Sequence, residues 1–322
     1  MEPQSALQTP ILTVTLNPAL DLSTGAAQVV PDIKLRCDPV VTDPGGGGIN
    51  VSRAIAVMGG HSQAMVALGG ATGQRIAEML PQPGIDVIAL PSPGETRQSL
   101  AVMDHNSGLQ YRFVMPGPEW DAAQVQQALD GIRAAACRDG WVVLSGSNPP
   151  GVPADFARRL SQRLRHCGAN LLVDTSGPAL HQVAKADDAA LAVLRMDEAE
   201  ATELAARPLP DRKASADFAS DLVASGVAQA VIVARGSDGN IVATPQGRWH
   251  AEAAKVDIIS KVGAGDSFVA GFVLARARGM DPARAMGLGA AAASATCMTP
   301  ATELCHAEDV AKLDAARVIT AI

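Results

Sequence analysis

The chain has 322 residues, of which 48% are hydrophobic and only 3% aromatic, and its formal net charge is −7. This length suits one large α/β domain or two smaller domains. The acidic balance argues against a surface that binds nucleic acid or an anionic membrane, so an anionic substrate would need a local basic cluster.

The cysteines and histidines indicate the cellular compartment of the protein and whether it binds a metal ion. Five cysteines are scattered without a Cys-x-x-Cys pair, and six histidines show no metal-ligand spacing. This usage is typical of a reducing cytoplasm and predicts neither a disulfide framework nor a zinc site. Residues 1–10 are too polar for a signal peptide, and the apolar stretch 285–298 is too short to span a bilayer. We therefore expect a cytoplasmic protein with a short polar extension, 1–10, before a single domain over 11–322.

The first apolar run, residues 11–16, is typical of a buried strand, and Asn17-Pro18 closes it. Asp21 follows a few residues later. In α/β proteins, polar residues just beyond the end of a parallel strand often bind ligands. Asp21 fits a turn residue equally well.

Two segments, residues 22–44 and 95–116, interrupt the α/β pattern. The first lacks helical periodicity, and the second contains two strands, 99–104 and 111–115, around an Asn-Ser-Gly turn. We expect an antiparallel hairpin here, in one small sheet with the first segment, which would form a lid. Such a sheet would gather four basic residues into a phosphate-binding cluster: Lys34, Arg36, Arg97 and Arg112. Solvated surface charge is the alternative.

Four consecutive glycines, Gly45 to Gly48, precede a helical pattern that contains Ile49, Asn50 and Ile55. Glycine loses more conformational entropy on folding than other residues, so this run indicates unusual dihedrals or close approach to a ligand. A flexible linker is the alternative, but linkers are not usually followed at once by an amphipathic helix. Asn50, in the first turn, can cap the helix or contact a ligand.

Apolar strand-like runs alternate with helical patterns along the remaining chain. The predicted strands are 63–69, 86–90, 141–144, 171–173, 192–195 and 231–234, and the predicted helices are 74–80, 121–136, 153–166, 197–206, 214–225 and 282–297. A second hairpin is expected around the turn 236–239. The turns after the strands carry Gly, Ser, Asp or Asn, and such turns meet at one edge of a parallel sheet. This pattern predicts one long ligand crevice.

The stretch Gly263-Ala264-Gly265-Asp266 precedes an apolar helical run in which Phe268 and Phe272 share a face. A Gly-rich turn that opens a helix presents free N–H groups and the positive end of the helix dipole, which suits an anion. A carboxylate beside an anion is unfavourable unless it has a chemical task. Accepting a proton from a nucleophile that attacks the anion is such a task. Simple helix capping by Asp266 is the alternative.

Pro44 to Asn50 and Gly263 to Ser267 together resemble the two signature regions of the PfkB/ribokinase carbohydrate kinases. The resemblance extends from Thr15 to about Cys305, and within the family it is greatest to the minor-isozyme type of bacterial 6-phosphofructokinase. Further matching stretches are 34–37, 69–73, 96–98, 111–117, 145–147 and 149–151. The resemblance implies a ribokinase-like three-layer α/β/α Rossmann-like core, with the small β lid often serving as a homodimer interface.

The resemblance also implies MgATP-dependent phosphorylation of a sugar hydroxyl. By resemblance, Asp266 is the general base, and Gly263, Ala264 and Gly265 form the anion hole for the transferring phosphoryl group. The sugar would be held by Asp21, Gly46, Gly47, Asn50 and Ser147, and its phosphate by Arg97 and Arg112, with Lys34 of a partner subunit's lid as a further candidate. Extra lid arginines suit a substrate that already carries a phosphate, such as a phosphorylated hexose.

The nucleotide end departs from the family pattern. By resemblance, ATP would contact Arg195, Asp197, Arg235, Gly236, Gly239 and Lys261, and Glu200 would bind Mg²⁺ through water; K⁺ is a further candidate cofactor. Where these phosphofructokinases usually have Lys-Pro-Asn-x-x-Glu, this chain has Arg195-Met196-Asp197-Glu198-Ala199-Glu200. Arg235 replaces a common small hydroxyl residue, Lys261 a common Thr or Ser, and Asn148 a Leu. We therefore expect this chain to bind the nucleotide or the metal ion in a way that differs from the family pattern.

Three alternatives to a 6-phosphofructokinase remain open. Asn17 to Asp21 is also reminiscent of 1-phosphofructokinases, although the run of four glycines favours a 6-phosphate substrate. A tagatose-6-phosphate kinase has the same reaction class. From a different class, the altered 195–197 segment fits a catalytically weak sugar-phosphate binder with a regulatory role, but a pure binder has no need of Asp266.

Overall fold

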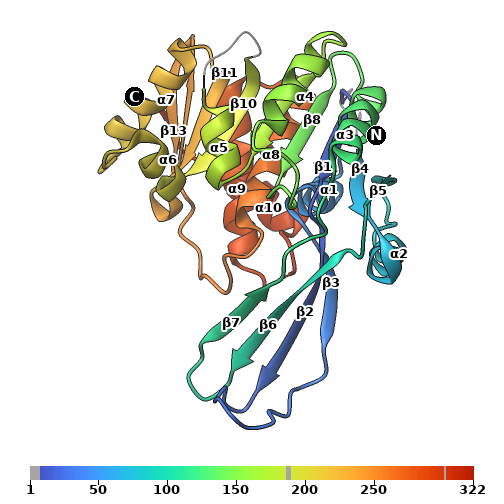
Figure 1. Ribbon diagram of the computed structural model, residues 1–322. Coiled ribbons are helices and arrows are strands. Elements are labelled where there is room, and N and C mark those ends of the chain that lie inside the picture. The colour runs from blue at the N-terminus through green and yellow to red at the C-terminus, as the bar shows by residue number, and fades with distance from the viewer. Residues whose placement is uncertain (1–7, 186–189, 301) are drawn as a thin grey trace, which may run out of the picture.

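The computed structural model describes residues 8–185, 190–300 and 302–322. Two sheets organise this part of the chain, a ten-stranded sheet between two layers of helices and a four-stranded sheet that extends away from it as an arm (Figure 1). The expected extension, residues 1–10, lies largely outside the described residues. The core has the three-layer α/β/α arrangement that the sequence predicts.

The large sheet has the strand order β14-β13-β12-β11-β10-β9-β8-β1-β4-β5. Seven neighbouring strands run parallel, namely β1 (Ile11–Thr15), β4 (Ser62–Leu68), β5 (Ile85–Pro91), β8 (Trp141–Ser145), β9 (Asn170–Asp174), β10 (Leu191–Asp197) and β11 (Ala228–Ala234). Three antiparallel strands extend it, namely β12 (Asn240–Thr244), β13 (Gly247–Ala251) and β14 (Ile319–Ala321). The parallel strands end at one edge, as predicted for a ligand crevice.

Each face of this sheet is covered by its own layer of helices. One layer contains α3 (Ala122–Ala135), α4 (Phe156–Arg165), α5 (Gly177–Val183), α6 (Glu198–Ala205) and α7 (Arg212–Ala224). The other contains α1 (Gly47–Val57), α2 (Gly70–Met79), α8 (Ala264–Ala277) and α9 (Pro282–Cys297), with α10 (Ala307–Ala316) against α9. Strand β1 shows the required alternation, because Leu12 and Val14 pack into the first layer's core and Ile11 into the second.

Small residues let α8 and α9 approach closely in a chain that is poor in aromatic residues. A Cβ added at Gly271 of α8 would lie 2.8 Å from the carbonyl oxygen of Leu288 of α9. Phe268 and Phe272 are stacked with their ring centroids 6.3 Å apart, which confirms that they share a face of α8. This packing fixes the N-terminus of α8, where Asp266 lies, against the large sheet.

The small sheet has the order β3-β2-β6-β7, and we call it the lid sheet. Its strands are β2 (Ala19–Ala26), β3 (Val41–Gly45), β6 (Arg97–Asp104) and β7 (Gln110–Val114). The β6–β7 hairpin is antiparallel, as predicted, whereas β2 and β6 pair in parallel. Strand β2 begins at Ala19, so Asp21 lies within a strand of the lid sheet and not in a turn after β1. The action of this sheet as a lid stays a prediction.

Other differences from the sequence analysis concern short or polar elements. Helix α2 begins at Gly70, four residues before the predicted start, because the Glu95 carboxylate accepts a hydrogen bond of 2.5 Å from the N–H of Thr72 in its first turn. Helices α5 and α10 and strands β13 and β14 were not predicted from the sequence. Strand β14 has three residues, too few for a periodic pattern. In the described part of the chain, no helix is both long enough and apolar enough to cross a membrane.

Candidate active site

Asp266 lies in the first turn of α8, directly after the glycine-rich turn. Its Oδ2 accepts a hydrogen bond of 2.9 Å from Nδ2 of Asn50, which lies in the first turns of α1. The Ser145 hydroxyl, at the end of β8, also hydrogen-bonds to this carboxylate. Burial raises the pKa of Asp266 to about 7, because desolvation penalises the charged form more than these partners favour it. A carboxyl group with this pKa can accept a proton near neutral pH.

The turn before Asp266 presents the backbone of a helix N-terminus. Gly263 is the N-cap residue and has φ 77°, a left-handed conformation that glycine adopts without strain. A Cβ added at Gly263 would lie 2.8 Å from Cδ2 of Leu304. The first N–H groups of a helix have no intrahelical partner, so this turn has the donors of an anion hole. The N–H of Ala264 donates to the carbonyl oxygen of Lys261 at a long 3.3 Å.

Arg195 and Asp174 form a buried ion pair beside this turn. Nη1 of Arg195, near the end of β10, lies 3.0 Å from Oδ1 of Asp174 at the end of β9, and the two side chains are 14% and 12% exposed. A Cβ added at Gly265 would lie 3.3 Å from Nη2 of Arg195, so the guanidinium group lies against the anion-hole turn. The structure therefore brings Arg195 next to Asp266.

The four-glycine segment passes between side chains that leave no room for a Cβ atom. A Cβ at Gly45 would overlap the Asp21 carboxylate, and one at Gly47 would overlap the Ser145 hydroxyl. Gly46, with φ 137°, is the N-cap residue of α1. The glycines thus allow the backbone to lie between Asp21 and Ser145, which decides against a flexible linker.

Asp21 and two arginines share one face of the lid sheet. Asp21 pairs with Ser99, and Arg112 pairs with Ala101, so these side chains point the same way as Arg97. Burial raises the pKa of Asp21, although the charges of Arg97 and Arg112 act in the opposite direction.

Backbone carbonyl groups hold Arg97 in place. Its Nη2 donates to the carbonyl oxygen of Asn17 at 3.1 Å and its Nη1 to that of Met115 at 3.3 Å. Asn17 also reaches the predicted site residue Ser147, because its Nδ2 donates to Oγ of Ser147 at 3.1 Å. Asn17 therefore links the arginine on the lid sheet to the turn after β8.

The structure does not bring Lys34 or Arg36 to this cluster. Both are exposed, in the loop 27–40 between β2 and β3, at the end of the lid sheet far from the core (Figure 1). Of the four basic residues that the sequence analysis grouped together, Arg97 and Arg112 are the two whose charges act on Asp21.

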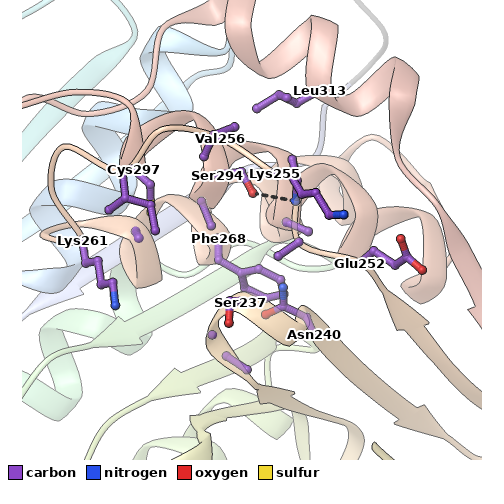
Figure 2. Close-up of a pocket in the computed structure, with 18 of the residues that line it drawn as sticks. Ser237, Asn240, Glu252, Lys255, Val256, Lys261, Phe268, Ser294, Cys297 and Leu313 are labelled. Carbon is purple, nitrogen blue, oxygen red and sulfur yellow. Dashed lines mark hydrogen bonds between the residues drawn. The ribbon is translucent and has the colours of Figure 1, made fainter.

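A cavity of about 1180 Å³ extends from the anion-hole turn along the sheet edge. Its walls come from the loop 252–261, from α8 and α9 and from the β11–β12 connection; Ser237 and Asn240 face Phe268 from one side, and Ser294 and Cys297 lie on the opposite wall (Figure 2). Among the predicted nucleotide residues it is lined by Arg195, Gly236 and Lys261. Pockets for drug-sized ligands measure roughly 300–1,000 Å³, so this one has room for a nucleotide.

The comparison with protein families decides the classification. The model of the pfkB family carbohydrate kinases matches residues 15–309. The chain belongs to this family. Members of it are carbohydrate kinases, so the chain is a phosphotransferase with a kinase's requirement for ATP and a divalent metal ion.

Among curated relatives, an ATP-dependent 6-phosphofructokinase isozyme 2 of Mycobacterium tuberculosis is 37% identical over 93% of this chain and 87% of the relative. The protein of the same name from Escherichia coli is 36% identical over 94% of this chain and 97% of the relative. A 1-phosphofructokinase of Xanthomonas campestris is 31% identical over 82% of this chain and 83% of the relative.

Solved structures of pfkB kinases share the fold. The crystal structure of Escherichia coli phosphofructokinase-2 in complex with potassium has a TM-score of 0.89 and 34% identity, covering 96% of this chain and 99% of that one. An Arabidopsis thaliana ribokinase has a TM-score of 0.72 at 18% identity, covering 95% and 99%, and shows the fold alone. The fold is therefore the ribokinase-like α/β fold that the sequence predicts.

The pfkB kinase pattern around Glu200 forms a helix cap in this chain. Asp197 Oδ1 accepts from the N–H of Glu200 at 2.9 Å, and Glu200 Oε2 accepts from the N–H of Asp197 at 2.8 Å. Burial raises the pKa of Glu200. No cluster of three or more ligating side chains occurs in residues 8–185, 190–300 and 302–322. One carboxylate with waters and substrate phosphates is a usual Mg²⁺ site, so Glu200 fits Mg²⁺ binding through water.

Arg235 was predicted to contact the nucleotide, but its side chain points elsewhere. It is 7% exposed, and its Nη1 donates to the carbonyl oxygen of Leu209 at 3.1 Å and to Oγ of Ser215 at 2.6 Å. Its Nε also pairs with Asp238 at 3.1 Å. A buried guanidinium group needs several partners, and the α6–α7 connection, α7 and the turn after β11 supply them. Gly239 is buried beside His250 and does not line the cavity, unlike its neighbour Gly236.

Sequence reasoning missed several residues that the structure places at the site. They are Asn17, Gly45, Ser145, Asp174 and Arg212. Four of them lie in strand-end or glycine-rich segments that the sequence analysis marked as ligand-facing. Arg212 lies at the start of α7 and carried no motif signal.

Proposed function

We propose that this pfkB kinase transfers the terminal phosphoryl group of ATP to D-fructose 6-phosphate, which gives fructose 1,6-bisphosphate. One observation carries the proposal: a carboxyl group with a pKa near 7 lies at an anion-hole turn, across the glycine segment from a lid face with Arg97 and Arg112. The relatives named 6-phosphofructokinase isozyme 2 support the same substrate.

Asp266 is the general base in this proposal. Its Oδ2 is oriented by Asn50, and the carboxylate accepts the proton of the attacking sugar hydroxyl as the new oxygen–phosphorus bond forms. The bond between the terminal phosphorus and the bridging oxygen of ATP breaks in the same transfer, and ADP leaves. The N–H groups of Gly263, Ala264 and Gly265 donate to the oxygens of the transferring group, where charge is concentrated in the transition state. MgATP, when bound, supplies the phosphoryl group together with a metal ion that neutralises its charge.

The sugar phosphate lies between the lid sheet and the core. Asp21 and Asn50, with the backbone of Gly46 and Gly47, hold the sugar hydroxyls, and Ser147 contributes a further hydroxyl. Arg97 and Arg112 bind the 6-phosphate, because guanidinium groups form bidentate, charge-assisted hydrogen bonds with phosphate. Lys34 reaches this site from the lid of a partner subunit, since within its own chain it lies at the distal end of the lid sheet.

The nucleotide occupies the 1180 Å³ cavity. Arg195, Gly236 and Lys261 line it. Asp197 and Glu200 lie near Arg195, where Asp197 would contact the nucleotide and Glu200 would hold Mg²⁺ through water. Gly239 acts indirectly, because its φ of 103° shapes the turn that Gly236 begins. A K⁺ ion is a further cofactor, supported by the potassium complex of the Escherichia coli relative.

We further propose that the enzyme is a homodimer that forms through the lid sheet. The lid exposes large apolar side chains that a solvated arm would not need: Val41, Leu109, Tyr111, Phe113, Val114 and Met115. A relative of known structure forms a tetramer in an inhibited state, so light scattering must decide the assembly of this chain.

A 1-phosphofructokinase is the second candidate, favoured by Asn17 to Asp21 and by the Xanthomonas campestris relative. A panel of phosphosugars, assayed with MgATP by coupled ADP release, separates the candidates. We expect the highest kcat/KM with fructose 6-phosphate, lower values with tagatose 6-phosphate and fructose 1-phosphate, and almost none with fructose. A higher kcat/KM with fructose 1-phosphate would replace the proposal, and binding without turnover would favour a regulatory binder.

A further inference from the structure

The ion pair between Arg195 and Asp174 lies directly beside the anion-hole turn that carries Asp266. Arg195 ends near the anion-hole turn, with Nη2 3.3 Å and Nη1 3.5 Å from the position of a Cβ at Gly265, the residue before Asp266. Asp174, on the neighbouring strand β9, orients this guanidinium group, with its Oδ1 3.0 Å from Nη1. The Nε atom of Arg195 is buried without a hydrogen-bond partner among the described residues.

The groups that face the Asp266 carboxyl come from four elements. They are Asn50 of α1, Ser145 of β8, Asp174 of β9 and Arg195 of β10. Among them Arg195 is the one cation, and it favours the ionised form, while Asp174 disfavours it. Lys261 belongs to the same turn as Asp266, but its side chain is exposed. Asp197 and Glu200 add negative charge around Arg195, so its single positive charge is shared by several carboxylates.

We propose that Arg195, oriented by its ion pair with Asp174, is a positioning residue that stabilises the ionised form of the base Asp266. This inference deepens the proposed function and rests on Asp266 as the base. Arginine suits the task because its charge is permanent, and its fork can hold Asp174 while its other face packs against Gly265. The charge of Arg195 thus offsets part of the negative charge of Asp174, Asp197 and Glu200 beside the site of proton transfer.

The inference predicts opposite effects for the two members of the pair. Removing the positive charge with Arg195→Met should raise the midpoint of Asp266 titration, by about one pH unit or more. Removing the negative charge with Asp174→Asn should lower it. The double variant removes both charges, so its midpoint should lie between those of the single variants, and Arg195→Lys should shift less than Arg195→Met.

The experiment follows the ¹³C signal of the Asp266 carboxyl by NMR in the free enzyme, with Asp266→Asn to assign the signal. This readout needs neither ATP nor metal. In parallel, the acid limb of the kcat profile is measured with fructose 6-phosphate, and its midpoint should move in the same order. Circular dichroism verifies folding, and the double variant serves where Arg195→Met alone does not fold, because it leaves no unpaired buried charge.

An unchanged Asp266 midpoint in Arg195→Met, or a midpoint in the double variant that is no higher than in Asp174→Asn, would overturn the inference. Shifts of the same sign in Arg195→Met and Asp174→Asn would overturn it too. Failure of the proposed function gives a different result. In that case Asp266→Asn keeps its turnover, whereas the NMR midpoints still respond to Arg195 and Asp174.

Discussion

The arginines at the two ends of the active site are held in different ways. At the core end, Arg195 pairs with Asp174, and Arg212 and Arg235 both pair with Asp238. At the lid end, Arg97 bonds to the carbonyl oxygens of Asn17 and Met115, and Arg112 is exposed without an ion pair in the described part of the chain.

This difference decides where positive charge is available for a ligand. A carbonyl group orients a guanidinium group without neutralising it, so the lid arginines keep their charge for a phosphate group. A carboxylate neutralises the guanidinium charge, so the core arginines mainly fix the cavity walls and change the pKa of nearby carboxyl groups. Under the proposed function, the nucleotide phosphates would then depend on backbone N–H groups, Lys261 and the metal ion. The following predictions test this contrast, beginning with the group that lies between the two ends.

Replacement of Asp266 by Asn should cause the largest loss of activity. General-base catalysis contributes about two to four orders of magnitude, so kcat should fall at least about 100-fold. Sugar phosphate binding should persist, since asparagine can keep a hydrogen bond to Asn50. Steady-state kinetics and calorimetric titration with fructose 6-phosphate measure both quantities. Unchanged turnover would remove Asp266 from the mechanism.

Replacement of Arg235 by Met should damage stability more than binding. It removes a buried cation from Asp238, from Ser215 and from two carbonyl groups, so the free energy of unfolding should fall by about 3 kcal/mol. Urea titration measures this loss. The KM for fructose 6-phosphate should stay the same in the folded fraction. A large increase in the KM for ATP at unchanged stability would show that Arg235 binds nucleotide after all.

Replacement of Arg97 by Met should affect the lid end selectively. Hydrogen bonds to charged groups contribute about 1.5–3 kcal/mol, so the KM for fructose 6-phosphate should rise roughly 10- to 100-fold. The KM for ATP should hardly change. Arg138→Met is the control, because Arg138 is an exposed arginine in the α3–β8 connection, at the edge of the large sheet opposite to the strand ends that form the site. Equal effects on both substrates would contradict the division between the two ends.

The raised pKa of Asp266 also predicts a modest gain in stability when this charge is removed. A carboxyl group whose pKa is about 7 in the folded protein, against an ordinary value of 3.8, stabilises the fold only while it is protonated. This stability is present below pH 4 and is lost as the pH rises through 7. Asp266→Asn should therefore be more stable than the wild type at pH 8, by about 1–2 kcal/mol, and equal to it near pH 4. Thermal unfolding at both pH values measures the difference.

The sequence by itself determined the α/β alternation, the glycine segments and the position of Asp266, because each depends on local signals. Four glycines before a helix indicate close approach of the backbone to other groups. A Gly-Ala-Gly-Asp turn that opens a helix indicates an anion site. The lid hairpin follows from its turn residues. Arg97 and Asp21 were both identified as ligand-facing, although Asp21 was expected after β1 and lies within β2.

Only the tertiary structure decided which charges meet. The parallel pairing of β2 with β6 joins segments 78 residues apart, Ala19 with Arg97, and so places Asp21 beside the lid arginines. The direction of Arg235 depends on carbonyl groups of the α6–α7 connection, and the partner of Arg195 lies on a different strand. Local propensity specifies an element, but the charge that a side chain retains depends on long-range contacts, which no motif encodes.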